Sequence, residues 1–341
     1  MIRLVHKDGR LRPLSLILLI ALPIITAVIC LGLGRLPLTV GEVVYALTSP
    51  VSGAELDQTT YSVVFNLRLP RTLLAIVLGA GLACAGAAFQ ALFANPLATP
   101  DTLGVTAGAS VGAIIAMMFD WSMFAVQTTA LVFGLASVLL TITVARTRGK
   151  TSIVMLVLAG VIISALFSAV ISILKYTADP LNKLPEITYW LMGSLSGTTY
   201  KTLAFGVPFI FIGLIVIFML RWRLNILTLS EDEARAAGIN VQRIRMTIII
   251  ASTMVTASCV SMCGQVGWVG LLVPHCARMI CGSNNRSVIP FSISFGAVFI
   301  VIIDTLARTA IASEIPISVL TAIIGAPFFI SLLRRTGGNW G

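Results

Sequence analysis

Charged side chains are scarce in this 341-residue sequence: Asp, Glu, Lys and Arg make up 11% of it, whereas hydrophobic residues make up 57%. The mean hydropathy is +1.01, and an ordinary soluble domain carries about 25% charged residues. These values exclude an ordinary soluble domain and indicate a protein whose surface faces lipid.

Histidine is nearly absent, because only His6 and His275 occur, and acid–base catalysis is therefore poorly supplied. The serine motif GSLSG at 193–197 has no HExxH, paired-aspartate or Ser/His/Asp set to accompany it. The stretch RGKTS at 148–152 is not a nucleotide-binding loop, since Val144 stands where the P-loop needs glycine. We expect a chain that is not an enzyme and has no ATPase of its own.

The sequence has no CxxC pair. Cys259 and Cys263 lie at helical i,i+4 spacing and Cys276 adjoins His275, so a metal cluster is one interpretation. Cysteine is also a small hydrophobe that is common in buried helices. We favour this second interpretation and expect neither a metal nor a cofactor. All six cysteines fall in or beside apolar runs: Cys30, Cys84, Cys259, Cys263, Cys276 and Cys281.

Long apolar runs dominate what is present. A helix crosses a bilayer with about 20 apolar residues, and runs of this kind predict helices rather than a barrel. Shorter runs, several of them broken by glycine or proline, occupy 103–119, 269–280, 288–307 and 317–333. We expect an all-α polytopic membrane protein with about ten transmembrane helices in one domain, 1–341. The clear runs are Leu14–Gly34, Thr72–Phe93, Phe124–Val144, Ile153–Leu174, Thr202–Leu220 and Met246–Cys263.

The first run follows several basic residues, as in a signal peptide. It is too long for such a peptide, and Cys30 follows the bulky Ile29 rather than small residues, so we favour an uncleaved first helix. The basic residues also set the orientation. With the tail 1–13 and both termini in the cytoplasm, sixteen of the 23 Lys and Arg residues lie inside, and this basic rim explains the net charge of +10 without nucleic acid. The seven outside are Arg35, Arg68, Arg71, Lys175, Lys183, Lys201 and Arg308.

A polar stretch interrupts the apolar pattern at 229–245. Ser230 is a good N-cap, and Glu233 completes a capping box with it. Glu231 adds negative charge to the first turn, and Gly238 supplies a helix stop. Asn240 can then cap a second helix that returns to the membrane. Two capped helices on the inner side predict a docking element rather than a merely solvated loop.

Small residues and broken segments indicate close packing and a path. Glycines at 79, 81, 86, 104, 108 and 112 predict helix surfaces that approach closely. The segments NPLATPDTLGVTAGA (95–109) and GQVGWVGLLVPHCAR (264–278) are broken by glycine or proline at corresponding places in the two halves. Such pairs favour an inverted repeat around a transport path. Asp304 and Arg308, at i,i+4, are expected to form an ion pair.

Four ordered stretches carry a family resemblance. They are LRLPRTLLAIVLGAGLACAGAAFQALFANPLATPDTLGVTAGA (67–109), YWLMGSLSG (189–197), GQVGWVGLLVPHCAR (264–278) and LARTAIASEIPISVLTAIIGAPFFISLL (306–333). Together they resemble the FecCD-type permeases of ATP-binding-cassette importers, which carry iron-siderophores, haem and vitamin B12. The resemblance implies a type II importer fold with ten helices per subunit and a homodimer or pseudodimer with the path between subunits. It also implies two cytoplasmic ATPases, an external binding protein, and the plasma (inner) membrane of a prokaryote.

The resemblance also assigns residues. The external arginines that meet acidic knobs of the binding protein correspond to Arg68, Arg71 and Arg308. The cytoplasmic gate corresponds to Thr151, Ser152, Ile153 and Val154. The coupling helices that contact the ATPase correspond to Ser230, Glu231, Glu233, Ala234, Arg235, Gly238 and Ile239.

Alternatives remain open from the residues alone. An ion-coupled secondary transporter would bury a coupling carboxylate near mid-membrane; Asp304 comes closest, but it lies near a helix end. A membrane enzyme ranks third. Within the importer class, iron chelates are the first expectation for the cargo, vitamin B12 and haem follow, and molybdate-type oxyanions remain an alternative.

Overall fold

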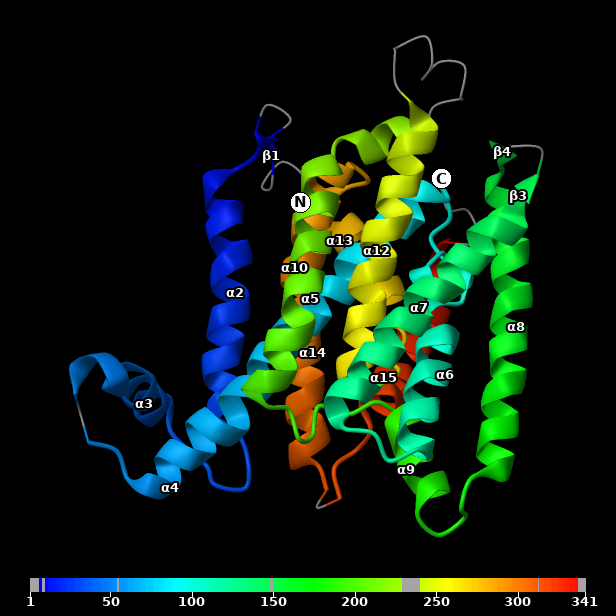
Figure 1. Ribbon diagram of the computed structural model, residues 1–341. Coiled ribbons are helices and arrows are strands. Elements are labelled where there is room, and N and C mark those ends of the chain that lie inside the picture. Colours follow the sequence, from blue (N-terminus) through cyan, green and yellow to red (C-terminus); the bar gives the residue numbers. More distant parts are fainter. Residues whose placement is uncertain are drawn as a thin grey trace.

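The computed structural model describes residues 6–7, 10–53, 55–147, 150–228, 240–311 and 313–336. Over these ranges the chain is a bundle of helices (Figure 1). Seven helices are long and apolar enough to cross a membrane, and three shorter apolar helices accompany them. The expectation of about ten membrane helices is therefore confirmed for the described residues.

The long helices include α2 (Pro13–Gly32), α7 (Met123–Ala145), α8 (Ile153–Thr177), α10 (Tyr200–Leu220), α12 (Val241–Cys263) and α14 (Asn285–Thr309). The seventh span is continuous from Gln58 to Leu92 and consists of α4 (Gln58–Tyr61), the π-helix η1 (Ser62–Arg68) and α5 (Leu69–Leu92). The shorter membrane helices are α6 (Val105–Met118), α13 (Val269–Cys281) and α15 (Ile317–Thr336). The 3-10 helix η2 (Pro100–Leu103) leads into α6, and η3 (Arg223–Thr228) follows α10.

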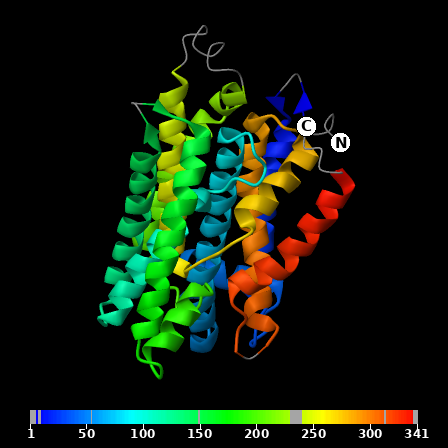
Figure 2. The ribbon, with the colours of Figure 1, turned by 90° about the vertical axis from the view of Figure 1, so that its right-hand side faces the viewer.

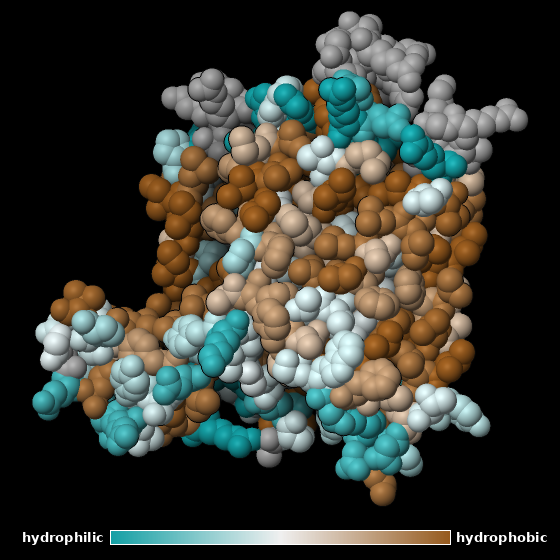
Figure 3. Space-filling model, viewed as in Figure 1, coloured by the Kyte–Doolittle hydropathy of each residue, from teal (hydrophilic) through white to brown (hydrophobic). Residues whose placement is uncertain are grey.

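The remaining elements lie at the two ends of the bundle. Helices α3 (Val40–Ser52) and α9 (Lys183–Leu191) lie at one end (Figure 1). The two-residue strands β1 (His6–Lys7), β2 (Arg10–Leu11), β3 (Arg146–Thr147) and β4 (Lys150–Thr151) form two small antiparallel pairs at the other. An apolar belt separates the two polar ends (Figure 3). The division of the basic residues between the two sides of the membrane stays a prediction.

Helices α5, α12 and α14 form the centre of the bundle. The buried share of the apolar stretch is 83% in the span that contains α5, 72% in α12 and 67% in α14, against 22% in α8. Glycine permits this packing, because a Cβ on Gly79 would lie 2.0 Å from the carbonyl oxygen of Gly296. Likewise, a Cβ on Gly86 would lie 2.1 Å from the carbonyl oxygen of Gly270. The sequence prediction of close helix contacts at Gly79 and Gly86 is confirmed.

The glycine series in the next segment serves two purposes. Gly108 and Gly112 bring α6 against α7, where a Cβ would lie 2.5 Å from the Ser137 side chain and 2.3 Å from the Thr129 carbonyl oxygen, respectively. Gly104 instead ends η2 with φ +85°, a left-handed conformation that favours glycine. The left-handed backbone conformation at Gly104 therefore produces the break before α6.

Candidate functional site

The two broken segments predicted from the sequence meet in the structure. The segment that leads into α6 runs between α8 and α13, on the side away from α2 (Figure 2). Thr99 and Asp101 come from this segment and Trp268 and Gly270 from the other, and all four line one hollow of about 60 Å³. Thr256 of α12 also contributes to its wall. The two segments, which occupy corresponding places in the two halves of the sequence, therefore lie side by side in the structure.

The second segment is held by a side chain from α5. Pro274 has no backbone N–H, so the carbonyl of Gly270, four residues earlier, has no donor within α13. The amide nitrogen of Gln90 donates to that carbonyl at 3.1 Å and to the carbonyl of Leu271 at 3.4 Å. The amide oxygen of Gln90 accepts from Arg278. Gln90 therefore stabilises the break in α13 and also fixes Arg278.

The turn that precedes α13 is also anchored. Trp268, at its N-cap, has φ +69°, which is costly for a bulky residue. Its ring packs on α15, since a Cβ on Gly325 would lie 2.9 Å from it. The Gln265 amide nitrogen donates to the Ser110 hydroxyl of α6 at 2.9 Å. These contacts bind the turn before α13 to α6 and to α15.

Two of the predicted docking arginines bind the end of α2. Arg68 donates to the carbonyl of Leu31 at 2.7 Å, and Arg308 donates to the carbonyls of Cys30 and Leu33. The last carbonyls of a helix lack intrahelical donors, and positive charge is favourable there. Both guanidinium groups thus attach α2 to the bundle.

The third arginine forms a buried charge cluster with α14. The Arg71 Nε lies 2.8 Å from the Asp304 carboxylate, and its Nη1 lies 3.0 Å from Glu314. The predicted Asp304–Arg308 pair is present, with a separation of 3.9 Å. Glu314 has φ +51°, and its bonds to Arg71 hold this strained residue. The three arginines lie at one end of the molecule, bound within the chain, and their docking role stays a prediction.

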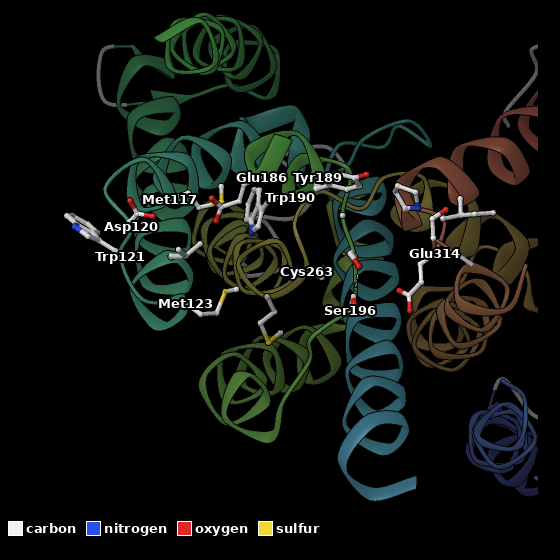
Figure 4. A pocket seen from close by; sticks show the side chains of 17 residues that line it. Met117, Asp120, Trp121, Met123, Glu186, Tyr189, Trp190, Ser196, Cys263 and Glu314 are labelled. Atoms are coloured by element: carbon white, nitrogen blue, oxygen red, sulfur yellow. Dashed lines mark hydrogen bonds between the residues drawn. The ribbon is translucent and has the colours of Figure 1, made fainter. Parts of the chain in front are cut away.

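Two hollows, each of about 520 Å³, open at this same end. The first, here called the basic hollow, is lined among others by Arg35, Arg68 and Arg308. The second, the acidic bowl, is lined among others by Asp120, Glu186 and Trp190 (Figure 4). Ser196, Ser313 and Glu314 line both and form the ridge between them.

A lysine side chain carries the opposite charge at the edge of the acidic bowl. Lys183 contacts Asp120 and lies 3.4 Å from Glu186, and its hydrogen bond to Asp120 raises the pKa of the Lys183 amine. Below the bowl, the Ile317 N–H donates to the Gly193 carbonyl at 3.0 Å. The end of α9 is therefore bound to the start of α15.

The predicted gate residues begin α8. The Ser152 hydroxyl accepts from the Met155 N–H at 3.2 Å and caps the helix. Thr151 belongs to β4, whose backbone pairs with β3. Ile153 is half-buried, whereas Val154 is 66% exposed. Val154 starts an exposed apolar face on α8 that continues through Leu158, Val161, Ile162, Leu166 and Ile173.

The predicted coupling helices are only partly covered. Ser230, Glu231, Glu233, Ala234, Arg235, Gly238 and Ile239 lie outside the described residues. The helix that follows is described, and the side chain of Asn240 accepts from the Arg243 N–H at 3.0 Å. The predicted cap of the second helix is confirmed.

The cysteines that suggested a metal cluster are packed among apolar residues. Cys259 and Cys263 are buried in α12, and the Cys263 thiol contacts the Cys259 carbonyl oxygen at 3.0 Å. Within the described ranges, no group of three or more His, Cys, Asp or Glu side chains could hold a metal ion.

A helical bundle in which two broken segments meet is typical of membrane permeases. The FecCD transport family model matches residues 20–335, and the chain belongs to this family. It is 41% identical over 320 residues to the molybdate import system permease protein MolB of Haemophilus influenzae, covering 93% of this chain and 95% of that protein. It is 33% identical to the hemin transport system permease protein HmuU of Yersinia pestis, covering 96% and 98% of the two chains.

A solved structure supports the same assignment. An inward-facing conformation of a metal-chelate type ABC transporter matches with a TM-score of 0.86 and 38% identity over 95% of this chain and 100% of that one. Other relatives are named as iron chelatin and vitamin B12 permeases. The predicted family and fold are confirmed, and the chain is a permease subunit of an ABC importer. Its relatives differ in cargo.

The structure adds residues that the sequence analysis did not single out. Gln90 was the only amide in its apolar run, and Asp101 the only carboxylate in the first broken segment. An isolated polar residue in a membrane segment is a usable signal. Their partners could not be predicted, because Gly270 lies 180 residues from Gln90 in sequence.

Proposed function

We propose that this permease imports a metal chelate, with an iron-siderophore as first choice and vitamin B12 or haem as the next, through a path between two copies of the chain. The observation that carries this proposal is the meeting of the two broken segments on the side of the bundle where α8 leaves an apolar face exposed. In the proposed homodimer, the second copy covers this face and the broken segments line the path.

The energy comes from two separate cytoplasmic ATPases. Each would dock on the coupling stretch 229–245, whose described part begins α12 at the end of the bundle that holds both described termini (Figure 1). Placing this end in the cytoplasm of a prokaryote puts sixteen of the 23 basic residues inside. The opposite end, with the basic hollow, then faces the external binding protein.

A binding protein with acidic projections fits the basic hollow. Arg35 is exposed there. Arg68 and Arg308 contribute positive potential from its wall although their guanidinium groups are bonded within the chain. Arg71 would act more indirectly, since it holds Glu314 on the ridge. The arginines thus combine a structural role with a steering role.

A second candidate cargo is molybdate. The observation in its favour is the 41% identity to the MolB permease. Mass spectrometry of the partner binding protein, purified with its natural ligand, tests the choice. The proposal expects a ferric chelate, a haem or a cobalamin; a bound molybdate would contradict the proposed cargo and leave the importer assignment intact.

A further inference from the structure

A carboxylate lies at membrane depth on the face proposed to line the path. Helix α6 has 14 residues, about 21 Å of rise, and it begins just after η2. Because α6 ends at Met118, just before Asp120 at the polar end of the bundle, and the hydrocarbon core is about 30 Å thick, we infer that η2 lies inside the membrane. Its Asp101 is nevertheless exposed at the surface of the single chain.

Among the described residues, Asp101 has no counter-charge. Its carboxylate accepts a hydrogen bond from the Thr106 hydroxyl. No lysine, arginine or histidine of the described part of the chain lies within salt-bridge distance of it. An unpaired carboxylate in an apolar medium is strongly unfavourable. An ionised Asp101 is therefore expected to face water, and within a membrane that means a hydrated path.

A buried hydroxyl beside Asp101 indicates water independently. Thr256 is 2% exposed, and its hydroxyl has no hydrogen-bond partner among the described residues. Thr256 and Asp101 line the same hollow of about 60 Å³, which has room for water. Buried hydroxyls are usually bonded to protein or to ordered water. The hollow thus continues the hydrated surface inward from Asp101.

From these contacts we propose that Asp101 is a specificity-determining residue that makes the path favourable to cationic or neutral chelates and unfavourable to small oxyanions. This inference rests on the proposed function, because a homodimer would place a second Asp101 on the same path. At about 8 Å, one unit charge changes the local concentration of a monovalent ion by roughly 2- to 30-fold for effective permittivities of about 80 to 20. A divalent oxyanion would be disfavoured more strongly. Trp268, on the same hollow, adds an aromatic wall that suits a cation or an apolar chelate.

Charged thiol reagents measure this potential directly. Leu97 is 50% exposed and lies four residues before Asp101, so Leu97→Cys is the reporter. All six native cysteines lie in described parts of the chain, and Cys276 alone is not buried; Cys276→Ser removes it. The probes are the trimethylammonium-ethyl and sulfonato-ethyl methanethiosulfonates, with rates normalised to those of a small free thiol.

We expect the cationic reagent to react about tenfold faster than the anionic one, and Asp101→Asn to remove most of this preference. Glu55→Gln, which neutralises an exposed carboxylate outside the path, should leave it unchanged. Thr106→Val alters the same site but keeps the charge of Asp101, so it should retain the preference. It controls for the possibility that Asp101→Asn loses the preference because the protein assembles poorly. An unchanged preference in Asp101→Asn, or a Leu97→Cys that neither reagent modifies, would overturn the proposal.

The thiol measurement requires neither ATPase nor binding protein, so it can fail or succeed independently of the proposed function. The cargo claim has its own test in the reconstituted importer. Molybdate uptake as fast as that of a ferric chelate would overturn the claim that the path disfavours oxyanions. ATP-driven uptake of the chelate alone, with Asp101→Asn improving molybdate entry, is the expected result.

Discussion

The amide nitrogen of Gln90 lies 3.1 Å from the carbonyl oxygen of Gly270, the group that Pro274 leaves without a donor in α13. One side chain of α5 thus replaces the missing helical hydrogen bond. The same amide bonds Arg278 through its oxygen. A break in a membrane helix is tolerated when neighbouring groups re-satisfy its backbone.

Gln90→Leu should destabilise the permease by about 1–3 kcal/mol, because the Gly270 carbonyl and the Arg278 guanidinium would each lose a hydrogen-bond partner. The measurement is the thermal unfolding of the purified protein in detergent. Gln127 provides a matched control, since it is 3% exposed and its amide nitrogen has no partner among the described residues. Gln127→Leu should be neutral or stabilising. Equal losses from both variants would contradict the role given to Gln90.

The buried pair of Arg71 and Asp304 predicts a strongly non-additive double mutant. Arg71→Met should cost about 3–5 kcal/mol, because it leaves Asp304 buried without its closest counter-charge. Adding Asp304→Leu should recover much of that loss, since replacing a buried pair by apolar residues is often neutral. Unfolding of the two single variants and the double variant completes the cycle. Simple additivity would show that the pair is not coupled.

Docking on the basic hollow predicts a salt-dependent affinity for the binding protein. Arg35→Glu should weaken the association several-fold, and added salt should weaken the wild-type complex. Arg35 is a better test position than Arg68 or Arg71, because substituting either of those two would break bonds between helices as well as change the charge. Lys201→Glu is the control, since Lys201 is exposed at the start of α10 and does not line the hollow. An affinity indifferent to both salt and Arg35→Glu would exclude docking there.

The gate at the start of α8 predicts state-dependent cross-linking. Cysteines at Ile153 and Val154 should link the two subunits in one nucleotide state and not in the other, since apolar gates close by excluding water from a constriction. Val154 is 66% exposed in the single chain, as either a gate or a lipid-facing residue would be. A cysteine at Leu139, 62% exposed on α7, serves as the lipid-facing comparison. Absence of cross-links in every state would assign Ile153 and Val154 to the lipid.

Most of the fold could be predicted from the sequence because long apolar runs and capping residues act locally. The cap at Asn240 and the close approach at Gly79 are examples. Span lengths were less predictable: the run starting at Thr72 belongs to a helix that begins at Gln58. The outer half of this helix is polar, so the apolar run in the sequence stops there although the helix continues.

The site was harder to predict because its partners are distant in sequence. Arg71 and Asp304 are 233 residues apart, and Arg68 binds a carbonyl 37 residues away. The sequence predicts that these arginines lie on one side of the membrane, and the structure brings them to one end of the bundle; that this end is external stays a prediction. It cannot show that their guanidinium groups are bonded within the chain, because helix packing alone decides which carbonyls they reach.

If this chain transports by coupling to separate ATPases, its activity must depend on ATP and not on an ion gradient. Uptake into proteoliposomes containing the permease, its ATPase and the binding protein should require ATP and persist when ion gradients are collapsed. Gly238→Val should insert normally but abolish uptake, because valine disfavours the left-handed helix stop expected from the sequence at Gly238. The neighbouring Ala237→Val should transport. Uptake that continues without ATP and stops when an ion gradient is collapsed would contradict the account.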